Sequence, residues 1–158
     1  MSELENNNPQ HIKWMREAIK LAQKAQECGE VPVGALITKN DTLISSAYNQ
    51  PITKHDPTAH AEIQALQQAG KILQNYRLND TVLYITLEPC AMCAGAIVHA
   101  RIGTVVFGAY DHKTGVAGSA GNIFTAEFSN HKPKIIGGTL EKECSLIIRN
   151  FFQARRQK

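Results

Sequence analysis

The sequence predicts an α/β fold in which a mixed sheet of about five strands carries helices on both faces. Two patterns lead to this prediction. Thr81–Ala109 reads as strand, helix and strand over about 30 residues, the length of a crossover unit with parallel strands. Two apolar runs on either side of Lys39-Asn40-Asp41 instead predict an antiparallel hairpin. No repeat, low-complexity tract or linker divides the 158 residues, so we expect a single domain over residues 1–158.

The N-terminal part is expected to form a helix followed by that hairpin. Apolar residues from Met15 to Ala25 recur at helical spacing with Lys and Gln between them, and the stretch stops at Gly29. Val33–Ile37 and Leu43–Tyr48 are the two short apolar runs that should pair as strands.

The middle of the chain predicts a helix, a central strand and a second helix. Asp56-Pro57-Thr58 is a helix start signal, because a polar side chain can cap free N–H groups and proline is tolerated in the first turn. We expect this helix to run to Gly70. Thr81–Thr86 is apolar on both faces, as a central strand is, and Glu88-Pro89 opens a short helix that ends near Ala100.

The C-terminal part predicts two more strands and a closing helix. Thr104–Ala109 should lie parallel to Thr81–Thr86, because such crossovers return to the same sheet. A last strand near Ile135–Gly137 leads into the final helix. Its apolar stripe consists of Leu140, Cys144, Ile147, Ile148 and Phe151.

Composition excludes several classes of protein. Hydrophobic residues make up 43% and charged residues 20%, close to globular averages, so neither a disordered nor a fibrous chain is indicated. Met1 to Gln10 is acidic and polar, unlike a signal peptide, and no apolar run approaches the ~20 residues that span a bilayer. We therefore expect a soluble, cytoplasmic protein without disulfides.

The charge is small but unevenly distributed. A net charge of +3 does not by itself indicate a nucleic-acid partner. The C-terminal end is a candidate basic patch, formed without any acid by Arg149, Arg155, Arg156 and Lys158. From charge alone, a solvated helix end matched to the helix dipole is the commoner interpretation.

Two short motifs together predict a hydrolytic metal centre. They are His60-Ala61-Glu62 and Pro89-Cys90-Ala91-Met92-Cys93. Cys90 and Cys93 are three apart at a helix start, so both sulfurs can point to one side while the helix dipole favours thiolates. With the imidazole of His60 they form a three-ligand zinc set, which leaves one position open for water.

Glu62 is predicted to lie outside the metal's ligand set. Residues two apart on a helix point in different directions, so Glu62 should not join His60 as a ligand. Bound zinc lowers the pKa of water from 15.7 towards ~7, and a nearby carboxylate can then shuttle protons.

Each motif taken alone has a less specific interpretation. A Cys-x-x-Cys pair can be a redox dithiol, and a His-x-Glu triplet recurs by chance. A structural zinc module is a further possibility, but it needs a fourth ligand, for which only Cys28 and Cys144 are spare. Cys144 lies on an apolar helix stripe and is most simply a small core residue.

The resemblance of this chain to a known family extends along nearly its whole length. Its segments are GEVPVGA (29–35), YNQP (48–51), HDPTAHAEI (55–63), TLEPCAMCAGAI (86–97), ARIGTVVFGAYDHKTGVAGS (100–119) and FFQARR (151–156). Through them the chain resembles the cytidine deaminase superfamily, and within it the bacterial tRNA-specific adenosine deaminases. The resemblance implies a three-layer α/β/α fold, a homodimer and one Zn²⁺ per subunit.

The resemblance also implies a reaction. Zinc hydroxide would attack C6 of the anticodon wobble adenosine while Glu62 shuttles protons, so that inosine forms and ammonia leaves. A free-base or nucleoside deaminase acting on guanine, cytosine or cytidine is the alternative, because the zinc chemistry would be the same. The loop 107–119 and the basic end favour RNA, whose anticodon loop presents unstacked bases.

Further residues take roles from the resemblance. His60, Cys90 and Cys93 resemble the zinc ligands, and Asn49 resembles the residue that hydrogen-bonds the flipped base. Asp111 resembles a contact to the target nucleotide's backbone or ribose.

Two more positions complete the expected pocket. Family geometry suggests that the N–H of Ala61 meets the substrate, and that Val33 forms an apolar wall.

Each of these assignments has a structural alternative. Asn49 could simply form a turn beside Pro51, Asp111 could cap the turn towards Gly115, and Val33 could belong to the strand core. Gln50 and Tyr110 stand where some relatives carry arginine, so contacts to the RNA backbone at these two positions are expected to differ. The basic end becomes a candidate phosphate contact.

Overall fold

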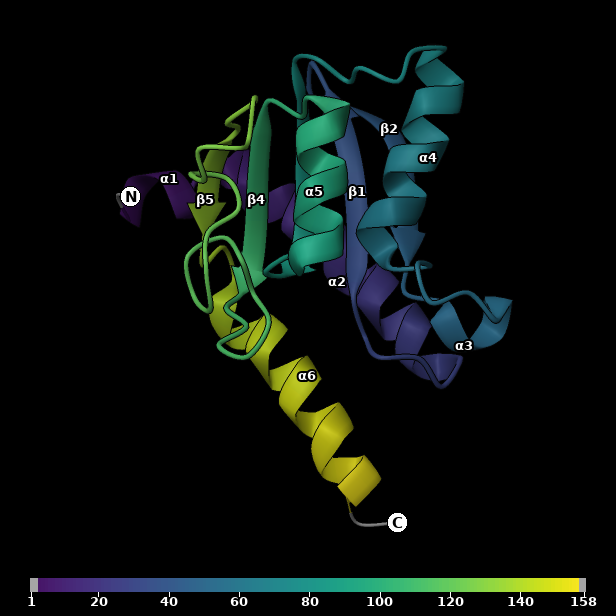
Figure 1. Ribbon diagram of the computed structural model, residues 1–158. Coiled ribbons are helices and arrows are strands. Elements are labelled where there is room, and N and C mark those ends of the chain that lie inside the picture. Colours follow the sequence, from purple (N-terminus) through teal and green to yellow (C-terminus); the bar gives the residue numbers. More distant parts are fainter. Residues whose placement is uncertain (1–2, 157–158) are drawn as a thin grey trace.

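The computed structural model describes residues 3–156, in which a five-stranded mixed sheet has the strand order β2-β1-β3-β4-β5 (Figure 1). The strands are β1 (Gly34–Lys39), β2 (Thr42–Tyr48), β3 (Thr81–Leu87), β4 (Thr104–Ala109) and β5 (Lys134–Gly137). β1 runs antiparallel to both of its neighbours, whereas β3, β4 and β5 are parallel. The predicted hairpin and parallel crossover are both confirmed.

The helices cover both faces of this sheet, which confirms the predicted three-layer fold (Figure 1). They are α1 (Glu3–Asn6), α2 (Pro9–Glu27), α3 (Pro51–Lys54), α4 (Ala61–Leu73), α5 (Ala91–Ala100) and α6 (Glu141–Arg156). None of the helices between residues 3 and 156 combines the length and the apolar character needed to cross a membrane.

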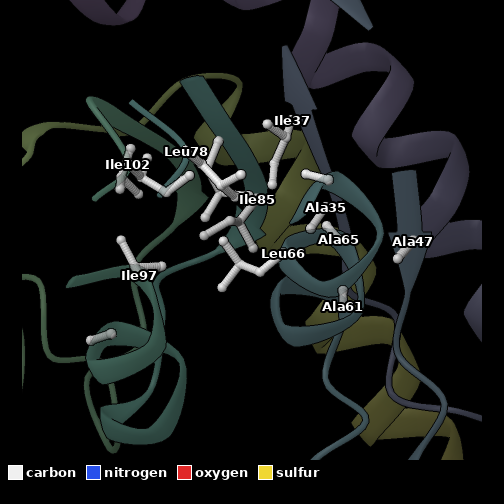
Figure 2. Close-up of a cluster of buried hydrophobic side chains, with 14 of the residues drawn as sticks. Ala35, Ile37, Ala47, Ala61, Ala65, Leu66, Leu78, Ile85, Ile97 and Ile102 are labelled. Carbon is white, nitrogen blue, oxygen red and sulfur yellow. The ribbon is translucent and has the colours of Figure 1, made fainter. Parts of the chain in front are cut away.

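Alternating strand residues divide the core between the two faces, because successive side chains of a strand point to opposite sides. Ala35 and Ile37 of β1 pack with α4 and α5, in the cluster drawn in Figure 2. Leu36, between them, packs with α2 on the other face. Cys144 of α6 is buried in this second cluster, which confirms it as a core residue.

The hairpin between β1 and β2 turns through Asn40 and Asp41, whose φ angles are 51° and 56°. Two consecutive positive φ angles characterise a type I′ turn, which matches the twist of the flanking strands, and Asn and Asp tolerate this conformation. The turn predicted at Lys39-Asn40-Asp41 is therefore confirmed.

The predicted helix start at Asp56-Pro57-Thr58 is wrong. Oδ1 of Asp56 accepts hydrogen bonds from the backbone N–H and the hydroxyl of Thr58, both at 2.8 Å. The aspartate therefore closes a local turn instead of capping a helix, as Asp side chains often do. α4 begins only at Ala61, and His60 is its N-cap.

Two short helices and several boundaries were not predicted. α1 and α3 have four residues each, too few for an apolar periodicity to show. α5 begins at Ala91 with Cys90 as its N-cap, three residues later than Glu88. α4 continues to Leu73 and not to Gly70, and β1 spans Gly34–Lys39 where Val33–Ile37 was expected.

Candidate deaminase site

One edge of the sheet gathers most of the predicted site residues. The register places Gly34 opposite Tyr48, Ala35 opposite Ile85 and Leu87 opposite Ala109. The start of β1 and the ends of β2, β3 and β4 therefore lie at the same edge. Val33, Asn49, Glu88 and Asp111 adjoin these strand ends, where α/β proteins commonly bind their ligands.

His60, Cys90 and Cys93 meet at this edge. The Nδ1 atom of His60 lies 3.6 Å from Sγ of Cys90 and 3.4 Å from Sγ of Cys93. The three ligand atoms lie within 4.8 Å of one another, and no other such group occurs in the part of the chain that the structure describes. One imidazole and two sulfurs are a donor set that suits a tetrahedral zinc ion with an open fourth position.

The remaining cysteines do not complete this cluster. Cys28 is exposed at the end of α2, and Cys144 is buried on α6. Among residues 3–156, neither belongs to a metal-binding group, so a closed four-ligand site has no support.

Helix starts make the cluster electropositive. His60 and Cys90 are the N-caps of α4 and α5, and neither side chain caps its helix. The first N–H groups of a helix lack partners within the helix, and the dipole there favours anions. These two helix ends therefore favour a thiolate at Cys90, which is itself an N-cap.

The two thiols of the cluster differ in their pKa shifts. A hydrogen bond with Cys93 lowers the pKa of Cys90 to about 4, while a hydrogen bond with Cys90 and burial raise the pKa of Cys93. The hydrogen bond to Cys90 raises the pKa of His60. The second thiolate is disfavoured beside the first, and a divalent cation between them would remove that penalty.

Glu62 lies beside the cluster as a buried acid. It is 4% exposed, and burial raises the pKa of its carboxyl group. The group of candidate metal ligands consists of His60, Cys90 and Cys93 and does not include Glu62. The reasoning from helical periodicity was wrong, however, because His60 is an extended N-cap residue and only Glu62 is within α4.

A pocket of about 220 Å³ opens onto the cluster. It is lined by Val31, Val33, Asn49, His60, Glu62, Leu87, Glu88, Cys90, Asp111 and Thr114. The structure thus brings Val33, Asn49 and Asp111 to the same pocket as Glu62. Ala61, the first residue of α4, is buried and does not line the pocket with its side chain.

Asn49 and Val33 are held together at the pocket wall. The backbone N–H of Asn49 donates to the carbonyl of Val33 at 3.0 Å. Both residues are 7% exposed. Val33 also belongs to the core cluster, and its side chain lines the pocket. Within residues 3–156, no hydrogen bond engages the side-chain amide of Asn49, and the geometry leaves that amide available to a ligand.

Asp111 caps its own loop, which was the structural alternative for this residue. Its Oδ1 accepts from the N–H groups of Lys113 and Thr114, both at 3.1 Å, and its Oδ2 accepts from the Thr114 hydroxyl at 2.9 Å. It also lines the pocket. A substrate contact by Asp111 would therefore use the lone pairs that the turn leaves over.

A second cavity of about 750 Å³ adjoins the pocket and shares part of its wall. The shared residues are Val31, Leu87, Asp111 and Thr114. Its other side carries Tyr110, His112 and Lys113 together with Ile148, Arg149, Phe152, Arg155 and Arg156 of α6.

The basic residues of α6 differ in their engagement. Arg149, Arg155 and Arg156 are all exposed, and Arg155 also donates to the carbonyl of Gly29 at 2.9 Å and stacks over the Phe151 ring. Lys158 lies outside the described residues.

Tyr110 packs edge-on against Phe107 and is 40% exposed. Gln50 is the N-cap of α3 and makes no capping bond with its side chain.

Sequence reasoning missed two polar residues that support the pocket. Glu88 is 2% exposed, lines the pocket and accepts hydrogen bonds from the loop after β4. Gln64 is buried, and its Nε2 donates to the carbonyls of Tyr48 and Ala59, which precede Asn49 and His60. The available signal was a lone polar residue at the end of an apolar strand or on the buried side of a helix.

Comparisons with known proteins agree with this geometry. The profile of the MafB19-like deaminase family matches residues 9–156. The tRNA-specific adenosine deaminase of Haemophilus influenzae is 49% identical over 147 residues, covering 92% of this chain and 85% of that protein. The tRNA-specific adenosine deaminase of Bacillus subtilis is 45% identical over 145 residues, covering 92% and 90%. The chain belongs to the tRNA-specific adenosine deaminases.

A solved structure supports this membership at the level of the fold. It comes from work on A-to-I editing by tRNA:A34 deaminases at the wobble position of transfer RNA, and it superposes with a TM-score of 0.84 at 38% identity. The match covers 85% of this chain and 98% of that chain. The resemblance to tRNA-specific adenosine deaminases and the fold it implied are confirmed.

Proposed function

We propose that this protein converts adenosine to inosine, by hydrolytic deamination, at the wobble position of a tRNA anticodon. The observation that carries the proposal is the 220 Å³ pocket, which brings candidate metal ligands, the buried acid Glu62 and the amide of Asn49 together. The names of the relatives in Haemophilus influenzae and Bacillus subtilis support tRNA adenosine as the substrate.

Zinc is the proposed metal, with one ion per subunit. His60, Cys90 and Cys93 would hold it, leaving the fourth position open. Zinc bound there would lower the pKa of a water molecule towards neutrality.

Glu62 is the proposed proton shuttle. Burial raises the pKa of its carboxyl group, which is the direction that acid–base catalysis near neutral pH requires. It would take a proton from the water that attacks C6, deliver it to the ring nitrogen and then pass a proton to the departing amine. The products are inosine and ammonia, so water is the only co-reactant.

The pocket walls would orient the base. Asn49 would hydrogen-bond the edge of the base with its free amide, while Val33 packs on a face of the ring. The N–H of Ala61 belongs to the uncapped first turn of α4, and it is proposed to meet a substrate oxygen or nitrogen. A pocket of this size suits one base taken out of its stack, which favours a single-stranded loop over a duplex.

The second cavity would hold the flanking nucleotides. Arg149, Arg155 and Arg156 line its far side and are candidate phosphate contacts. Asp111 and Thr114 line both cavities, so the target ribose would lie near them. Tyr110 adds an exposed ring on which a base could stack.

A homodimer and a cytoplasmic location complete the proposal, with residues 1–158 acting as one deaminase domain. An apolar groove of about 820 Å³ between α4 and α5 supports a second copy as partner. Two large side chains near it, Ile72 and Tyr76, are 59% and 72% exposed. The cytoplasm is proposed because tRNA is modified there.

The test is a substrate panel. Zinc-loaded protein is offered an anticodon stem-loop with a wobble adenosine and, separately, free guanine, cytosine and cytidine. We expect inosine from the stem-loop and no comparable turnover of the small compounds. Turnover of a free base or nucleoside without turnover of the RNA would replace the proposal by the small-molecule alternative.

A further inference from the structure

The loop that follows β4 is held by a single buried carboxylate. We call residues 111–119 the substrate loop, because Asp111 and Thr114 line the pocket. Oε1 of Glu88 accepts from the N–H of Asp111 at 3.1 Å and from the Ser119 hydroxyl. Oε2 accepts from the N–H groups of Ala117 at 3.0 Å and of Ser119 at 3.1 Å.

The loop also packs directly against this carboxylate. A Cβ added at Gly115 would lie 2.4 Å from Cδ of Glu88 and 2.5 Å from the carbonyl oxygen of Asp111. Glycine is therefore required for this close approach. The neighbouring backbone adds one more connection, since Val116 N–H donates to the Pro89 carbonyl at 3.0 Å. The substrate loop is thus fastened to the segment that leads into Cys90.

Every partner of this carboxylate is a donor. An ionised glutamate has acceptor sites on both oxygens and no proton to place, which suits three N–H groups and one hydroxyl. A glutamine in the same place would direct its NH₂ group at least at one N–H group, whichever way it is turned. Because the site is buried, water cannot compensate the unpaired donors.

We propose that Glu88 is a positioning residue for the deaminase reaction, which fixes the substrate loop, and with it Asp111, relative to the cluster of His60, Cys90 and Cys93. The proposal rests on the function proposed above. Glu88 would act through the loop, so its loss should weaken substrate binding before it weakens the chemical step.

The experiment compares Glu88→Gln with wild type in the zinc-loaded protein. We expect one zinc per chain to remain bound and the KM for the anticodon stem-loop to rise about tenfold or more, with a smaller fall in kcat. Hydrogen exchange should accelerate at the amides of Asp111, Ala117 and Ser119 and stay unchanged in β4. A fall in kcat alone, or unchanged exchange in the loop, would overturn the proposal.

A double-mutant cycle with Asp111→Ala separates positioning from general stability. If Glu88 acts through Asp111, the two effects on KM are not multiplicative. The KM of the double variant is then little higher than that of the single variant with the higher KM. Multiplicative effects would contradict the proposal.

Glu30→Gln is the matched control, since Glu30 is also buried and accepts from donors only, at Ile52 and Thr53. It should leave exchange in the substrate loop unchanged. Accelerated loop exchange in this control as well would count against a specific role for Glu88.

A second perturbation covers the case in which Glu88→Gln fails to fold. Gly115→Ala keeps the carboxylate and displaces the loop from it, so the same rise in KM with retained zinc is expected. An unchanged KM in this variant would refute the positioning role. If wild type fails to deaminate the stem-loop, the proposed function fails, while loop exchange and zinc content still test Glu88.

Discussion

At the scale of single residues, the site depends on buried polar groups whose ordinary state is altered by their surroundings. Burial raises the pKa of Glu62, and a hydrogen bond with Cys90 together with burial raises the pKa of Cys93. Burying these two groups costs free energy of folding, because a buried charge or an unpaired polar group destabilises the fold, and a merely structural site would gain nothing from it. Such strongly shifted groups in a pocket are typical of functional sites.

Replacing Glu62 with Ala or Gln should abolish proton transfer and preserve the metal. We expect turnover of the anticodon stem-loop to fall by about 10²–10⁴-fold, the usual contribution of an acid–base catalyst. Metal analysis should still find one zinc per chain, because the ligand group does not include Glu62. Normal turnover would remove Glu62 from the reaction, and lost zinc would make it a ligand.

The two buried cysteines should differ in their effect on zinc. Cys93→Ser removes a ligand and is expected to lose zinc at micromolar chelator, whereas Cys144→Ser on α6 keeps it. Both variants replace a buried thiol, so Cys144→Ser controls for the loss of stability. Zinc loss in Cys144→Ser would favour a closed structural site.

Glu30 should make stability depend on acid. Burial acts to raise its pKa, but hydrogen bonds from Thr53 and Ile52 outweigh this, and the folded-state pKa is lowered. A lowered pKa stabilises the fold above the unfolded value of ~4.3, and the stabilisation is lost as pH falls through the folded-state pKa. Denaturant unfolding of wild type and Glu30→Gln should differ by about 1–3 kcal/mol at pH 7. The difference should shrink below about pH 4, and a constant difference would contradict this.

At the scale of elements, the sequence predicted the regular core and the hairpin turn, but it mistook the turn at Asp56 for a helix start. Thr104–Ala109 was predicted to the residue, because a buried strand carries a continuous apolar signal. The start of α4 was misplaced because Asp56 suits an N-cap and an Asp turn equally well, and only the chain beyond it decides. The candidate ligand group was nonetheless recognisable, since His60 and the cysteines carry their own chemical signature.

The supporting residues of the pocket were harder to predict for a different reason. Glu88 and Gln64 act through bonds to backbone groups that are distant in sequence, and backbone groups leave no trace in the amino-acid pattern. The turn made by Asp111 and Lys113 is local and was foreseen as an alternative. Side chains that bind local backbone are thus predictable from sequence, while those that join separate segments need the fold.

The exposed arginines of α6 should contribute to RNA affinity through charge. In Arg149→Gln combined with Arg156→Gln, we expect weaker binding of the anticodon stem-loop and a salt dependence whose slope falls by about 0.7 per lost phosphate contact. Lys142→Gln, at the exposed start of the same helix, is the control. Binding isotherms at several salt concentrations measure both. An equal loss of affinity in the control would show that the effect comes from net charge and not from these two arginines.

At the scale of the whole molecule, the fold brings together segments that lie far apart in the chain. The pocket takes residues from the start of β1, the ends of β2, β3 and β4, and the first turns of α4 and α5. α6 then extends past this edge and adds its basic end to the neighbouring cavity (Figure 1). A small pocket for one base beside a larger basic cavity is an arrangement that fits a nucleotide within a strand better than a free base.

The most direct test of this account is the position of inosine in RNA treated with the zinc-loaded protein. Two anticodon stem-loops are compared, one with adenosine at the wobble position and one with that adenosine moved by one nucleotide. The account predicts inosine in the first, at the wobble position only, and little in the second. Equal conversion of both stem-loops, or conversion of free adenosine at the same rate as the RNA, would contradict it.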